Sequence, residues 1–186
     1  MQRPASQSVL QLRVQLGRVD PVVWRRLLVP GTVHLGKLDL MVQAAMGWTN
    51  SHLHCFRVDK LSYGFVDDLA DDVIDRDEKT LTVSEAFEAE RRLVYEYDFG
   101  DSWEHDVVVE DRLSLRLGLK FAVCLDGQNA CPPEDCGGSR GYRAMLESLA
   151  DPADDEHDSY LTWLGGPFDA SAFSLAEANA ALQRVR

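Results

Sequence analysis

The fold is decided first by the stretch Leu10-Gln11-Leu12-Arg13-Val14-Gln15-Leu16, in which apolar and polar residues alternate at every step. A period of two places the apolar side chains on one face of a strand and the polar side chains on the other. We therefore predict a strand that packs one face on a core. Residues 22–29 are rich in Val and Leu and predict a second strand, paired with the first, which Pro30 and Gly31 end.

The middle of the chain predicts one helix followed by further strands. Apolar residues recur at helical spacing over residues 38–46, and Gly47 stands where a helix commonly stops in a left-handed conformation. Residues 52–58 alternate again and predict a strand, and residues 121–125 predict a short one.

A hairpin and a loop follow. Residues 93–97 and 103–109 alternate on either side of Phe99-Gly100-Asp101-Ser102, which is typical of two strands joined by a turn. The loop over residues 127–141 contains Pro132-Pro133 and Gly137-Gly138, residues that restrict or extend the backbone angles of ordered loops.

The C-terminal third is helical in pattern. Apolar stripes run over residues 142–149 and 160–164. Ser174 followed by Glu177 is a capping box, so we expect the last helix to start there and to bury Leu175 among other apolar residues.

We therefore predict an α+β fold, with a mixed, mainly antiparallel β-sheet packed by helices and a helical C-terminal third. A chain of 186 residues with 45% hydrophobic residues can build one core. Neither an internal repeat nor a low-complexity linker divides it, so a single domain over residues 1–186 is the expectation.

The formal net charge of -12 constrains the partners. Nucleic-acid affinity rests largely on Lys and Arg, so the charge argues against non-specific nucleic-acid binding. A local concentration of arginines in the N-terminal strands is interpreted as solvated strand faces and edges: Arg13, Arg18, Arg25 and Arg26.

No membrane or secretion segment is expected. The longest apolar stretches are interrupted by charge and fall far short of the roughly 20 residues that span a bilayer. The N-terminus offers no basic segment followed by an apolar run. We therefore expect a cytoplasmic protein whose cysteines are reduced thiols.

Four stretches resemble, in order and spacing, the Ri-plasmid ORF-three-like family. They are Gly47-Trp48 with residues 51–56, then Tyr95–His105, then Cys131–Gly138 with Gly141-Tyr142, and finally Trp163–Asp169. The resemblance implies a protein associated with plasmids and insertion elements, some of which carry a TnpR-like passenger label. A recombinase would need clustered Arg and Lys near a nucleophilic Ser or Tyr, and the sequence offers no such cluster.

The hairpin and the Pro-Pro loop together predict a polar pocket. Its candidate residues combine carboxylates with an imidazole, a mixture that acid–base or metal chemistry requires: Asp98, Asp101, Trp103, His105, Glu134 and Asp135. The alternative is structural, with the two turn aspartates bonding the turn backbone and His105 lying beside Trp103 in the sheet.

A zinc site is a second candidate. Zinc favours thiolate and imidazole in a tetrahedron, which Cys124, Cys131 and Cys136 could form with His105 or His52 as the fourth ligand. No Cys-x2-Cys knuckle is present, and the alternative is that these cysteines are small buried residues.

His52 and His54 are two residues apart, which in a strand places both imidazoles on one side. They either bind a metal together or pack and hydrogen-bond beside Phe56 and Trp48. The apolar neighbours favour packing.

Residues 67–78 are dense in Asp and Glu and predict an exposed loop. The glycine and the closing glutamate of an EF-hand are missing, which argues against a calcium loop.

Three functional hypotheses remain. The first is a small binding or accessory protein of mobile elements, with an unknown protein or small molecule as its partner. The second is a metal-dependent hydrolase that uses Asp98, Asp101, His105 and Glu134. The third is a protein-interaction module that presents the acidic loop 67–78 to a basic partner.

Overall fold

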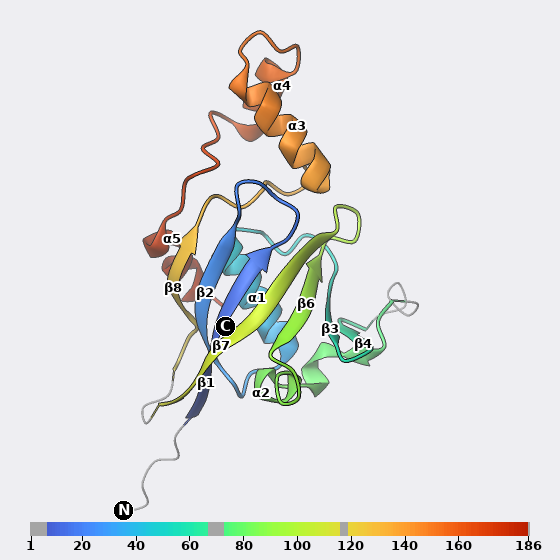
Figure 1. Cartoon of the computed structure of the whole chain (residues 1–186), viewed down its shortest axis with the longest axis vertical. Coiled ribbons are helices and arrows are strands. Elements are labelled where there is room, and N and C mark those ends of the chain that lie inside the picture. Colours follow the sequence, from blue (N-terminus) through green and yellow to red (C-terminus); the bar gives the residue numbers. More distant parts are fainter. Residues whose placement is uncertain (1–6, 67–72, 116–118, 186) are drawn as a thin grey trace, which may run out of the picture.

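The structure is a computed structural model that describes residues 7–66, 73–115 and 119–185. Within these ranges, eight strands form one open sheet with the order β5-β4-β3-β6-β7-β1-β2-β8 (Figure 1). The strands are β1 (Gln7–Leu16), β2 (Trp24–Pro30), β3 (His54–Val58), β4 (Leu61–Gly64), β5 (Arg76–Asp77), β6 (Arg92–Tyr97), β7 (Trp103–Leu115) and β8 (Val123–Gln128). Every neighbouring pair is antiparallel except β4 with β5, so the predicted mixed, mainly antiparallel sheet is confirmed.

Helices complete the α+β fold. They are α1 (Leu35–Met46), the 3-10 helix η1 (Glu78–Thr80), α2 (Val83–Ala86), α3 (Gly138–Ala150), α4 (His157–Leu164) and α5 (Leu175–Leu182). None of the helices in the described ranges is both long and apolar enough to cross a membrane.

The alternating stretch at the N-terminus forms β1, which lies between β2 and β7. Its apolar side chains are fully buried, whereas Gln11, Arg13 and Gln15 face the other side of the sheet. The alternation therefore places a continuous apolar surface in the middle of the sheet, on the side where α1 packs.

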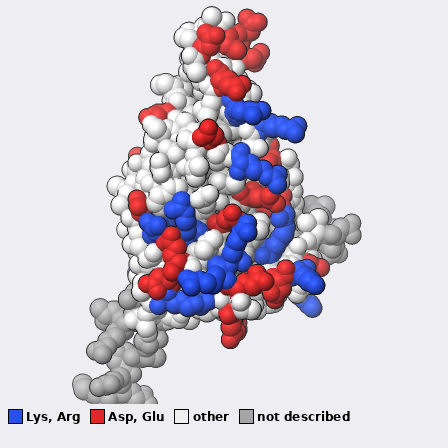
Figure 2. All heavy atoms as spheres, viewed as in Figure 1, with Lys and Arg blue, Asp and Glu red and all other residues white. Residues whose placement is uncertain are grey.

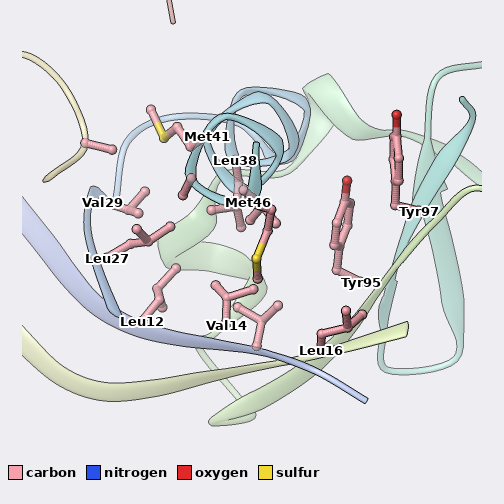
Figure 3. Packing of buried hydrophobic residues seen from close by; sticks show 14 of the residues in the cluster. Leu12, Val14, Leu16, Leu27, Val29, Leu38, Met41, Met46, Tyr95 and Tyr97 are labelled. Atoms are coloured by element: carbon pink, nitrogen blue, oxygen red, sulfur yellow. The ribbon is translucent and has the colours of Figure 1, made fainter. Parts of the chain in front are cut away.

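Helix α1 lies across that surface (Figure 3). It starts after His34, whose side chain accepts from the Lys37 N–H, and it ends at Gly47 in the left-handed region. Leu38 and Met46 point toward Leu12 and Val14, so α1 covers the middle of the core (Figure 3).

The opposite face of the sheet is exposed and carries charged residues of both signs (Figure 2). Arg26 pairs with Glu110, Arg92 pairs with Asp106, and Arg57 of β3 bonds to one glutamate of β6 and one of β7. Positive charge on this face is therefore largely balanced within the chain, as expected for a solvated sheet face.

The prediction of a helical C-terminal third needs correction. Helix α1 lies between β2 and β3 and α2 between β5 and β6, so helices are not confined to the end of the chain. They lie there because the sheet needs cover on its apolar face. Helices α3 and α4 instead project beyond one end of the sheet, and α4 buries no residue (Figure 1).

Leu175 is also placed differently from the prediction, since it is 42% exposed while Ala178 and Leu182 of the same helix are buried. Ser174 does cap α5, because its side chain accepts from the Glu177 N–H. A residue that directly follows the cap points away from the face that α5 presents to α1 and β8.

Shortening a buried side chain of β1 should destabilise this core. We expect Leu12→Ala to lower the free energy of unfolding by about 2–5 kcal/mol, because a buried leucine loses its contacts and leaves a cavity. The matched control Leu175→Ala should change it by less than about 0.5 kcal/mol. Urea denaturation measures both, and equal effects of the two substitutions would contradict the assigned core.

Candidate functional site

The hairpin turn and the Pro-Pro loop meet at one end of the sheet. Asp101 Oδ2 accepts a hydrogen bond from the Gly137 N–H at 3.1 Å. A Cβ atom on Gly138 would lie only 2.6 Å from the carbonyl oxygen of Asp101, and Gly138 has a φ of +66°. Only glycine allows this close approach of the two backbones.

Hydrogen bonds of Glu134 and Trp48 hold the Pro-Pro loop against the segment that follows α1 and against β6. The Glu134 carboxylate accepts from the Tyr97 hydroxyl and from both the N–H and the hydroxyl of Thr49. Burial disfavours its charge, but these hydrogen bonds outweigh burial and hold the pKa of Glu134 below its ordinary value. The Trp48 Nε1–H donates to the Pro132 carbonyl at 3.0 Å.

At this junction His52, Asp98 and Asp135 form a group of three possible metal ligands. One ligand atom from each lies within 4.8 Å of the other two, and the structure contains no such second group among the described residues. His52 precedes β3, Asp98 belongs to the hairpin turn and Asp135 to the Pro-Pro loop. Three separate segments therefore contribute one ligand each.

Both aspartates are held in an unusual backbone conformation. Asp98 has a φ of 58° and Asp135 a φ of 61°, a region that residues other than glycine rarely occupy. Asp98 Oδ1 accepts from the Gly100 N–H at 2.9 Å, which leaves its second oxygen toward His52. Such conformations persist only where the surrounding structure enforces them, and they cluster at functional sites.

The imidazole of His52 lies between the two carboxylates. Its Nδ1 is 3.5 Å from Asp98 Oδ2, and its Nε2 is 3.3 Å from Asp135 Oδ1. Nε2 is shut off from solvent and has no hydrogen-bond partner. Its contact with Asp135 is therefore close but is not a hydrogen bond. A nitrogen and carboxylate oxygens of this kind suit zinc or manganese.

A cavity of about 470 Å³ adjoins this group, and His52 forms part of its wall. The cavity also contains His54, which lies between two carboxylates. Its Nε2 is 2.6 Å from Glu78 Oε2, and its Nδ1 is 3.4 Å from Asp39 Oδ1. Asp39 in turn accepts from the Tyr95 hydroxyl at 2.6 Å.

The two carboxylates favour a protonated His54. Burial alone would lower its pKa, but the hydrogen bond to Glu78 and the charge of Asp39 outweigh burial and raise the pKa above the ordinary value. Burial raises the pKa of Asp39 as well. His54 is therefore a protonated imidazole on the wall of the cavity, with each ring nitrogen facing a carboxylate.

His105 and Trp103, two of the predicted pocket residues, lie in the core instead. His105 is 1% exposed and packs edge-on against Trp48 with ring centroids 5.3 Å apart. Burial lowers the pKa of His105 to about 4, so the imidazole is neutral. His105 lies with Trp103 and Val107 on the buried face of β7, so its side chain points into the core.

The three cysteines do not gather with either predicted histidine. The single group of possible metal ligands among the described residues contains His52 and no cysteine. Burial raises the pKa of Cys124, and that of Cys136 to about 12, so both remain thiols. His52 and His54 line the same cavity but contact different carboxylates, and β3 starts only at His54.

The prediction that residues 67–78 form an exposed loop is wrong for Glu78, which is 6% exposed. Its carboxylate is buried because His54 and the first turn of α1 surround it, and a Cβ atom on Gly36 would lie 2.1 Å from Glu78 Oε1. Asp75 and Asp77 accept backbone N–H groups. Residues 67–72 of the segment lie outside the described ranges.

Asp39 and Glu78 are functional candidates that the sequence did not reveal. Asp39 lies one turn before Gln43 in a helix with apolar residues around it, and the Gln43 amide donates to it at 2.9 Å. The sequence did contain one signal for Asp39, because an acid and an amide stand four residues apart inside an apolar stripe.

Comparisons with known proteins support one family assignment. A sequence model of the plasmid pRiA4b ORF-3-like protein family matches residues 8–177. The uncharacterized protein y4hQ of Sinorhizobium fredii is 40% identical over 177 residues, which cover 94% of this chain and 91% of the relative. The crystal structure of a protein of unknown function, MM3350 from Methanosarcina mazei Go1, aligns with a TM-score of 0.82 and 31% identity, covering 92% of this chain and 97% of the other.

The buried His105 should make the protein sensitive to acid. Its folded-state pKa of about 4 lies below the value of 6.5 for an ordinary histidine, so the unfolded chain binds the proton first as the pH falls. Its contribution is complete above about pH 6.5, and about 3 kcal/mol is lost as the pH falls to about 4. In His105→Leu this part of the pH dependence should vanish. Urea denaturation of both proteins across that range measures it, and identical slopes would contradict the assignment.

Proposed function

This chain belongs to the plasmid pRiA4b ORF-3-like family, and from that premise we propose that it is a small binding protein that holds a divalent cation between His52, Asp98 and Asp135. The partner of the cation is a small molecule in the adjoining cavity. In cells, the protein acts in the cytoplasm as an accessory factor of plasmids and other mobile elements.

The observation that carries the proposal is the convergence of an imidazole and two carboxylates from three different segments. His52 Nε2 is sealed from solvent beside Asp135 without a hydrogen bond, and buried polar atoms normally have a partner. A cation would supply that partner and neutralise the two carboxylates. The ligand types favour zinc or manganese over calcium, which prefers oxygen ligands alone.

The site is also held in place before any cation arrives. Asp101 and Glu134 bind the loop to the hairpin and to Thr49, so the segment that carries Asp135 has a fixed position. Preorganised ligands increase affinity because less conformational freedom is lost on binding. The four free cysteines accord with the proposed reducing cytoplasm.

Metal-dependent hydrolysis is the second candidate, with a changed set of residues. His52 takes the role first assigned to His105, and His54 is favoured as the general acid because Glu78 and Asp39 keep it protonated. Both histidines line the same cavity. The interaction module built on residues 67–78 stays a prediction, since half of that segment lies outside the described ranges.

Removal of one ligand should weaken cation binding. Titration calorimetry with manganese and with zinc should show one site per chain in the metal-free protein. Asp135→Asn should weaken binding at least about tenfold, since even outer-shell partners contribute about 10- to 100-fold to metal affinity. Asp135 is exposed and asparagine tolerates its backbone conformation, so the variant should fold normally.

The matched control is Asp155→Asn, an exposed aspartate between α3 and α4, which should bind both metals like the original protein. Asp98→Asn gives a second measurement on the same site. The proposal is rejected if neither metal binds, or if all three variants bind equally.

Hydrolysis predicts a separate effect of His54. With manganese present, p-nitrophenyl phosphate, bis-p-nitrophenyl phosphate and p-nitrophenyl acetate test three ester classes. His54→Gln should slow the accepted substrate by about 100-fold or more, since a general acid typically contributes that much, while the manganese affinity stays the same. Absence of manganese-dependent turnover of all three esters counts against this candidate and leaves cation binding untouched.

A further inference from the structure

A second cavity lies at the other end of α1, against Arg25 of β2. Its volume is about 610 Å³, within the range of small-molecule sites. Residues 44–47 at the end of α1 line it, whereas the cavity beside His52 and His54 is lined by residues of the first half of α1. The two cavities are therefore separate.

Arg25 is 3% exposed, and its guanidinium is only partly satisfied. Nε donates to the Ala45 carbonyl at 2.9 Å, and Nη1 donates to the carbonyls of Trp24 at 2.8 Å and Gln128 at 3.0 Å. These bonds use three of the five N–H groups of a guanidinium. Nη2 has no hydrogen-bond partner among the described residues, and it is not one of the polar atoms sealed from solvent.

The charge of Arg25 also lacks a carboxylate partner. No Asp or Glu of the described ranges lies within ion-pair distance of its guanidinium. Burial lowers the pKa of Arg25 from its ordinary value, which reflects the cost of a charge removed from water. Buried charges are normally paired, so an anion in the cavity would complete this environment.

The remaining wall is apolar and made of small residues. The Phe173 ring stacks on the guanidinium 4.4 Å from its carbon, and much of the rest of the wall is alanine: Ala44, Ala45, Ala130, Ala172, Ala178 and Ala181. Ser174 and the first turn of α5 complete the rim, where a helix N-terminus favours negative charge. The exposed Glu177 at the same rim opposes it.

We propose that this cavity binds a small monocarboxylate with an apolar body. The carboxylate accepts from Nη2 of Arg25, and the apolar body covers the alanine wall. The lining includes a single cationic side chain, which suits one carboxylate better than a phosphate dianion. The proposal is independent of the cation site, because the cavity is lined by none of the three cation ligands.

Benzoate is the probe for the test, with its neutral counterpart benzamide and inorganic phosphate as comparisons. Titration calorimetry in the presence of a chelator should show saturable binding of benzoate, at least about tenfold tighter than that of either comparison, because a charged hydrogen bond is involved. Glu177→Gln should tighten benzoate binding by removing the opposing charge. Equal binding of benzamide and benzoate, or binding of neither, would overturn the proposal.

Two variants separate the cavity from the stability of the fold. Arg25→Lys should weaken benzoate binding about tenfold or more, since lysine cannot reproduce the fork of the guanidinium. Ala172→Phe keeps Arg25 and fills the cavity from an exposed position, so binding should be lost with little change in melting temperature. The control Ala153→Phe, at an exposed site between α3 and α4, should bind normally. Full benzoate affinity in Ala172→Phe would place the ligand elsewhere and falsify the assignment.

Discussion

The structure depends on a sheet that buries only one of its faces. The apolar side chains of β1 supply the middle of that face, and α1 covers it (Figure 3). Because the other face meets solvent, it carries charged residues of both signs (Figure 2), several of which form ion pairs. Polar groups that lie on the covered face must therefore find partners inside the protein, and Asp39, His54 and Arg25 all do so at the surface of α1.

This arrangement explains why the two cavities adjoin different ends of one helix. The first half of α1 adjoins His54 and Glu78, and its last turn accepts the hydrogen bond of Arg25. A cavity lies at each end of the helix. One is formed between α1 and α5, and the other between α1 and residues 50–54.

The junction of the hairpin and the Pro-Pro loop has a different origin. It is built from backbone contacts that require glycine at residue 138 and left-handed angles at Asp98 and Asp135. These contacts bring one imidazole and two carboxylates together at one end of the sheet. The family model matches residues 8–177, a range that includes the segments that form this junction.

The amino-acid sequence by itself determined the elements with strong local patterns: the alternation of β1, the helix that stops at Gly47 and the hairpin on either side of its turn. It also singled out Asp98, Asp135 and His52, because turn residues and motif histidines are visible one by one. Only the tertiary structure decided that His105 is buried, that Glu78 is buried against His54, and that α3 and α4 project beyond one end of the sheet. The physical reason is that local patterns act over a few residues, whereas burial and ion pairing depend on which distant segments meet.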